Sequence, residues 1–209
     1  MMVRKTILTL IMGSSLLLGG TAIAAPDAAK LAKDKCDSCH GEKGNSDKDR
    51  VPSIASYSTT FFTDTMTAYR EGSRKGSQFE ELKLDVEIDE ADMNAVVEKL
   101  SEEEITALGK YFAAQKFIPR QQEVDPKLVK KGEKLYKKCK KCHADNGSDP
   151  DDDAGILAGQ WKPYMKFRIE QIAKDTRKKW MKKMKKKLKT LKKGDTEALF
   201  DFFASQKGD

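Results

Sequence analysis

The sequence predicts an all-α protein made of two similar units in tandem. One order of features occurs twice, because the segment Cys36–His40 returns as Cys139–His143, 103 residues later. Farther along, 107–116 matches 198–207 at an offset of only 91 residues. The first unit should therefore hold twelve extra residues, which we place in the polar stretch 71–92.

Helical spacing of apolar residues predicts the individual elements. A short helix should lead into each cysteine pair, since apolar residues from Leu128 to Tyr136 recur at helical spacing before the second pair. Middle helices are expected at 61–70 and 164–174. The stretch 82–88 is the one that alternates apolar and polar residues, and it predicts an edge strand or an extended loop.

The last helix of each unit should begin at a side-chain cap. Ser101 and Glu104 have the spacing of a capping box, which starts a helix that runs through Gln115. Asp195 is the matching N-cap candidate for a helix that ends near Gln206.

Two prolines mark a linker between the units. Pro119 and Pro126 enclose a polar stretch, and each proline disfavours helix at the residue before it. We expect an N-terminal domain at 25–116, a linker at 117–126 and a C-terminal domain at 127–209. The two domains are called the first and the second unit below.

Residues 1–24 have the pattern of a secretory signal peptide. A basic start at Arg4 and Lys5 precedes a short apolar run, and Ala22 and Ala24 form a small-residue cleavage site. The run is shorter than the roughly 20 apolar residues that span a bilayer. We expect cleavage near Ala24, export to the periplasm and no stable insertion into a membrane.

The two halves of the chain carry opposite charge. Residues 25–118 hold 13 Lys+Arg and 19 Asp+Glu, a net charge of −6, whereas residues 119–209 hold 25 and 14, a net charge of +11. Much of the excess lies in residues 178–193, which we call the Lys-rich face. It is either a solvated surface that covers a cofactor or a docking site for an acidic partner. Its composition also suits membrane surfaces and nucleic acid, but we do not expect nucleic acid as a partner of an exported chain.

Both Cys-x-x-Cys-His motifs predict a covalently attached haem. Cysteines three residues apart are neighbours on one helical face, so that both thiols can add to the two vinyl groups of one haem. The histidine that follows is placed to bind the iron. The motifs use all four cysteines and both histidines of the chain: Cys36, Cys39, His40, Cys139, Cys142 and His143. We therefore expect two haem c groups.

Two other interpretations explain fewer of these features. Zinc ribbons usually keep their cysteine pairs 15–20 residues apart, and these pairs are about a hundred residues apart. A thioredoxin-like redox motif needs a βαβ context, of which the sequence gives no sign. Neither interpretation explains why a histidine follows each pair.

The repeat predicts the second axial ligand of each iron. The chain has no third histidine, so methionine is the candidate. Met93 and Met184 are 91 residues apart, and each stands seven residues before a leucine. We expect the ligand pairs His40/Met93 and His143/Met184, with Met181 as the runner-up in the second unit. Ligation by His and Met raises the haem potential and leaves no open position for substrate, which favours a carrier over a catalyst.

Further motifs resemble those of the dihaem class I cytochromes. Cys39-His40-Gly41, the Met-x6-Leu frames and Asp125-Pro126 before 131–135 are similar to the cytochrome c4 family. The segments 115–122, 156–164, 181–184 and 198–206 resemble the cytochrome subunit of flavocytochrome c sulfide dehydrogenase. The resemblance implies two tandem class I cytochrome c domains, each wrapped around one haem.

The resemblance implies electron transfer, in one of two roles. In the first, the chain is a haem subunit that accepts electrons from a sulfide-oxidising flavoprotein and is not catalytic alone. In the second, it is a free-standing carrier, like cytochrome c4, between a respiratory complex and a terminal oxidase or reductase. A dihaem enzyme such as a peroxidase is a third hypothesis, from another class, which requires one haem with an open or labile position.

Overall fold

The computed structural model describes residues 25–82, 84, 89–174 and 181–207, and within these ranges the chain forms helices and turns but no strand. The helices are α1 (Ala28–Lys35), α2 (Asp37–His40), α3 (Thr59–Arg70), α4 (Met93–Glu98), α5 (Glu102–Ala113), α6 (Pro126–Tyr136), α7 (Lys162–Ala173), α8 (Lys182–Leu188) and α9 (Asp195–Ser205). Short 3-10 turns lie at Glu42–Gly44, Asp145–Gly147 and Pro150–Asp152. The all-α prediction is confirmed.

Two stretches whose structure was predicted from the sequence lie wholly or mostly outside the described residues. The signal peptide at 1–24 is outside the described residues, and so is most of the alternating stretch 82–88. None of the helices in the described ranges is long and apolar enough to cross a membrane.

The tandem repeat is present in the backbone hydrogen bonds. Ile54 N–H donates to Gly44 O at 2.7 Å, and 103 residues later Leu157 N–H donates to Gly147 O at 2.8 Å. A bond between the middle and the end of each unit follows both offsets, because its donor shifts by 103 residues and its acceptor by 91. Ser56 N–H donates to Phe112 O at 2.9 Å, and the matching pair is Gly159 N–H and Phe203 O at 2.8 Å.

The change of offset falls between the third and fourth helices, as predicted. Helices α3 and α7 have 12 residues each and start 103 residues apart. Met93 in α4 and Met184 in α8 are 91 residues apart. The extra residues of the first unit therefore lie between Arg70 and Met93.

Of the two predicted helix N-caps, one is confirmed and the other is wrong. Ser101 and Glu104 form the predicted capping box, with Glu104 N–H donating to Ser101 Oγ at 3.1 Å. Asp195 is not the N-cap of α9, because Gly194 takes that place with φ +79° and Asp195 is the first helical residue. The Asp195 carboxylate accepts instead from Lys192 N–H at 3.0 Å.

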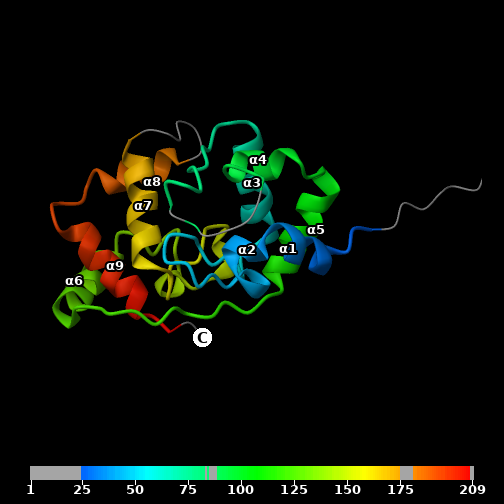
Figure 1. The fold of residues 1–209 in the computed structure, drawn as a ribbon. Coiled ribbons are helices and arrows are strands. Elements are labelled where there is room, and N and C mark those ends of the chain that lie inside the picture. Colours follow the sequence, from blue (N-terminus) through cyan, green and yellow to red (C-terminus); the bar gives the residue numbers. More distant parts are fainter. Residues whose placement is uncertain (1–24, 83, 85–88, 175–180, 208–209) are drawn as a thin grey trace, which may run out of the picture.

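Each unit packs its helices around its own apolar cluster. In the first unit, α1, α3 and α5 bury residues such as Phe62, Leu108 and Phe112. In the second unit, α6 crosses α9 so closely that a Cβ on Gly132 would lie 2.0 Å from Ala198 O. In Figure 1, α6 and α9 lie at one end of the molecule, α1 and α5 at the other, and the linker runs along the lower edge.

Polar contacts join the two units. The Gln160 side chain is fully buried and bonds both backbone groups of Ser53, accepting from its N–H at 3.1 Å and donating to its O at 3.0 Å. Tyr164 N–H donates to Asp49 O at 3.0 Å. The linker adds a bond from Arg120 N–H to Gly159 O at 2.8 Å. The units therefore share a fixed interface in which α7 faces the first unit.

Candidate functional site

The first Cys-x-x-Cys-His motif is folded around a helix junction. Cys36 ends α1 and begins α2, which carries the other residues of the motif. Cys39 and His40 are buried, with 7% and 9% of their surface exposed. Directly after His40 the chain turns at Gly41, whose φ is +74° and where a Cβ would lie 2.2 Å from Asn45 O. Glycine is required there because other residues rarely adopt a positive φ and none has room.

The His40 ring is oriented by one backbone group. Its Nδ1 lies 2.9 Å from Pro52 O, and donation to this carbonyl places the proton on Nδ1. The Nε2 atom is then unprotonated, which is the form that binds a metal ion. Burial of the ring lowers the pKa of His40, and the neutral imidazole is favoured further.

A cavity next to this motif brings the predicted ligands of the first haem together. The space between its lining residues amounts to about 1060 Å³, a value that includes open solvent. Cys36, Cys39 and His40 line it together with Met93 from the start of α4. Met66 of α3 lines the same cavity. The thiols, the imidazole and the thioether around one apolar space fit a covalently attached haem.

Two further elements close this cavity, and the sequence-based prediction missed both. The extra residues of the first unit contribute Arg74, Phe79, Leu82 and Leu84. Helix α7 of the second unit contributes Tyr164, Phe167, Arg168 and Gln171. The α7 residues have the spacing i, i+3, i+4, i+7 of a single helix face, but Arg168 and Gln171 are polar, so no apolar stripe in the sequence identifies this face.

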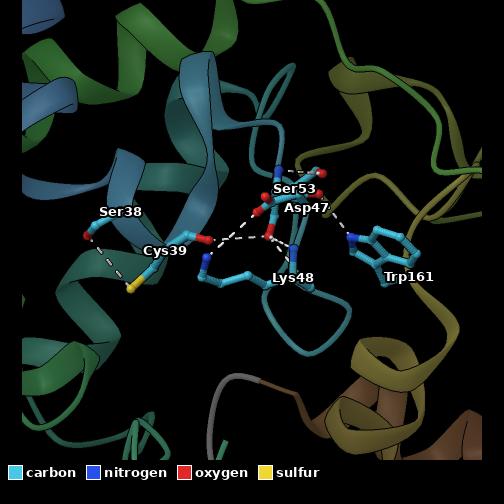
Figure 2. Close-up of polar contacts among 7 residues, drawn as sticks. Ser38, Cys39, Asp47, Lys48, Ser53 and Trp161 are labelled. Atoms are coloured by element: carbon cyan, nitrogen blue, oxygen red, sulfur yellow. Dashed lines mark hydrogen bonds and ion pairs between the residues drawn. The ribbon is translucent and has the colours of Figure 1, made fainter. Parts of the chain in front are cut away.

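Hydrogen bonds of Ser46 connect the first motif to the second unit, and Figure 2 shows Cys39, Ser53 and Trp161 around this contact. Its hydroxyl donates to Cys39 O at 3.2 Å, and its backbone N–H donates to Ser53 Oγ at 3.1 Å. From the second unit, the Trp161 indole N–H donates to Ser46 O at 3.0 Å. Ser46 therefore ties the loop after the motif to Cys39 on one side and to Trp161 of the second unit on the other.

Around Arg74, aromatic side chains from both units meet. The guanidinium lies 4.4 Å from the centroid of the Tyr69 ring, and Arg74 is only 7% exposed. Burial raises the pKa of Tyr57 well above its ordinary value and the pKa of Tyr164 to about 12. Both tyrosines therefore stay neutral, and this side of the cavity carries a buried positive charge among uncharged hydroxyls.

The second Cys-x-x-Cys-His motif has the same backbone contacts in a more open setting. His143 N–H donates to Cys139 O at 3.2 Å, as His40 N–H does to Cys36 O at 2.8 Å. Cys139 is partly buried, but Cys142 is exposed and His143 only partly buried. The Tyr136 hydroxyl donates to His143 O at 2.7 Å.

Among the described residues, the His143 ring has no counterpart of the hydrogen bond that orients the His40 ring. Gly155 corresponds to Pro52, yet in the part of the chain that the structure describes no hydrogen bond joins the His143 ring to it. Burial lowers the pKa of His143 as well, so that this imidazole is also favoured in the neutral form. The donor set again fits a haem attached through two thioethers.

Met184 lies in α8, which is rich in lysine, and its side chain is partly buried. The runner-up Met181 directly precedes α8 and is partly buried too. The residues just before it, 175–180, are outside the described ranges. The preference for Met184 therefore continues to depend on its 91-residue register with Met93.

Known proteins share this arrangement. A model of the cytochrome c family matches residues 25–116. Cytochrome c4 from Stutzerimonas stutzeri is 30% identical over 173 residues, which make up 76% of this chain and 78% of that protein. Cytochrome c4 from Azotobacter vinelandii is 28% identical over 187 residues, 83% of this chain and 84% of that protein.

A solved structure extends the similarity to the fold. The crystal structure of reduced recombinant cytochrome c4 from Pseudomonas stutzeri matches with a TM-score of 0.70 at 24% identity. The match covers 88% of this chain and 98% of that one. The two units therefore have the fold of two class I cytochrome domains in tandem.

Proposed function

Because the chain belongs to the cytochrome c4 family, we propose that it is a free-standing periplasmic carrier that takes electrons from one redox protein and delivers them to another. Family membership implies two covalently bound haem c groups. The relatives support this role better than the haem subunit of a sulfide dehydrogenase, which was one of the two roles expected from the sequence. The signal-peptide pattern at 1–24 supports export.

The observation that carries the proposal is the cavity shared by His40 and Met93. A haem held between these two side chains has no coordination position left for a substrate. The group itself supplies reversible one-electron transfer at its iron. The peroxidase hypothesis requires an open position, and the approach of Met93 to the cavity argues against it.

Each proposed site residue has one task. The thiols of Cys36, Cys39, Cys139 and Cys142 would attach the two haems through thioethers. His40 and Met93 would hold the iron of the first haem, and His143 and Met184 would hold that of the second. The lining of the first cavity is mainly apolar, and such surroundings would favour the reduced state of a bound haem, because that state carries less charge at the iron.

The Lys-rich face is the proposed docking surface for an acidic redox partner. In α8 and the residues after it, all lysines except the partly buried Lys185 are exposed, and α8 contains no acidic residue. Such a cluster raises the encounter rate with a negatively charged partner, and salt weakens the effect. Docking there would bring the partner to the more open of the two sites.

The haem content tests the core of the proposal. We expect the intact mass of the exported protein to equal that of the chain plus two haems. Replacing Cys36 and Cys39 together with Ala should remove one haem and leave the other. A chain with no covalent haem, or with a single one, would contradict the dihaem assignment.

Purification from the native source separates the carrier from the sulfide dehydrogenase subunit. A carrier should elute as a free cytochrome that contains no flavin. Co-elution with a flavin-containing chain through several columns would instead support the subunit role.

A further inference from the structure

Asn94, the residue after Met93, binds three backbone groups of the chain that precedes it. Its side-chain N–H groups donate to Tyr69 O at 2.6 Å and to Arg74 O at 3.0 Å. Its carbonyl oxygen accepts from Gly76 N–H at 2.6 Å. The amide thus ties the start of α4 to the end of α3 and to the turn that follows α3.

The turn approaches α4 so closely that only glycine fits at position 76. A Cβ on Gly76 would lie 2.9 Å from Met93 N and 3.1 Å from Asn94 Oδ1. Asp92 strengthens the same junction, since it accepts from Ala95 N–H at 3.0 Å and from Gln78 Nε2 at 3.0 Å. The backbone of Met93 is therefore fixed from two directions.

The residue at the position of Asn94 in the second unit cannot make these bonds, which we call the clamp. The position 91 residues after Asn94 is Lys185, and an ammonium group has three donors but no acceptor. It cannot accept the N–H bond that Gly76 gives to Asn94. Gly76 and Gln78 lie in the stretch between Arg70 and Met93 in which the first unit is twelve residues longer.

We propose that Asn94 is a positioning residue that holds Met93 on the iron of the first haem. This inference rests on the proposed ligation by Met93. A methionine whose backbone is fixed has fewer ways to leave the iron, so an exogenous ligand must break the clamp or strain it. Lys185, the residue after Met184, cannot make the bonds of Asn94, so Met184 should be the more easily displaced of the two ligands.

Imidazole competition on the full-length, haem-loaded protein tests the proposal. Groups that orient a metal ligand typically change metal affinity about 10- to 100-fold when they are mutated. In Asn94→Ala, we expect imidazole to bind the first haem about tenfold more tightly, with the second haem unchanged. The isosteric Asn94→Asp should behave alike, because its carboxylate would face two carbonyl oxygens. Glu98→Ala, at an exposed position of the same helix α4, is the matched control and should change neither affinity.

The variant Met93→Ala assigns the signals and separates two kinds of failure. It should remove one of the two methionine–iron signals in the proton NMR spectrum, which identifies the first haem. If both signals persist, Met93 is not a ligand and the clamp proposal falls with it. If one signal disappears but Asn94→Ala shifts the imidazole affinity less than twofold, the ligand assignment stands and the clamp proposal is wrong.

Gly76→Ala tests the clamp from its other side. The added methyl group should displace α4 and weaken methionine ligation in the same way, even if Asn94→Ala fails to accumulate. Gly72→Asn is the control in the same turn, because Gly72 has φ +67° and open space for a Cβ, and asparagine tolerates that conformation. An unchanged imidazole affinity in Gly76→Ala would overturn the proposal.

Discussion

The two Cys-x-x-Cys-His motifs share their backbone hydrogen bonds but differ in enclosure. The first motif is buried, and its cavity is lined further by Phe79, Leu82 and Leu84 and by α7 of the other unit. The second motif exposes Cys142 and is followed by a lysine-rich helix. The same pentapeptide therefore gives two unequal sites, because its neighbours in the fold decide how much water and charge each site meets.

The charge of each half follows the same division. The half with the closed cavity carries a net charge of −6, and the half with the open motif carries +11. A carrier that exchanges electrons through its open, positively charged site and shields the other has a defined face for its partner. Each of the following substitutions alters one side of this asymmetry, and the free-energy change expected from it decreases from the first to the last.

The largest effect is expected at the crossing of α6 and α9 in the second unit. Gly132→Ala would place a methyl group 2.0 Å from Ala198 O and 2.6 Å from Phe202 Cβ. Overpacking of this kind costs about 3 kcal/mol. In urea, the second unit should unfold at a lower midpoint concentration than the first. Ala29→Ser, at the corresponding exposed position of α1, is the control, and an equal effect of both changes would contradict the comparison.

The next effect is expected at the interface between the units. Gln160→Ala leaves both backbone groups of Ser53 without their buried partner, at a cost of about 2 kcal/mol. The two units should then unfold in separate transitions, which calorimetry can resolve. Gln206→Ala is the control, because Gln206 bonds only within its own unit, to Phe202 O and Ser205 Oγ. A single transition in Gln160→Ala would mean that other contacts couple the units.

A smaller effect is expected from the Lys-rich face. Reversing three exposed lysines, Lys182, Lys183 and Lys186, to Glu should slow oxidation by an anionic reagent about tenfold at low ionic strength, which corresponds to about 1.4 kcal/mol. Stopped-flow oxidation by hexacyanoferrate(III) measures the rate. The same reversal at Lys43, Lys110 and Lys116 of the first unit should have little effect. A rate that does not vary with salt would argue against electrostatic docking.

The sequence could predict what depends on local pattern. The two motifs, the 91-residue register of the methionines and the capping box at Ser101 follow from spacing alone, and the fold bears out the repeat. The predicted N-cap of α9, Asp195, is one residue too late, because Gly194 adopts a left-handed conformation and takes the N-cap place. The contribution of Tyr164 to the first cavity and the bonds of Asn94 depend on how distant segments pack, and no local pattern determines that.

The smallest effect is expected at the start of the terminal helices, where the two units use different devices. Ser101 caps α5 through the reciprocal capping box, whereas Asp195 of α9 accepts from Lys192 N–H and pairs with Lys131 Nζ at 2.9 Å. Ser101→Ala should cost about 1 kcal/mol, seen as a lower melting temperature of the first unit. Thr196→Ala, in the first turn of α9, removes only an exposed contact to Glu197 and should cost less than about 0.5 kcal/mol. Equal losses would mean that the start of α9 also depends on this exposed hydroxyl and not on Asp195 alone.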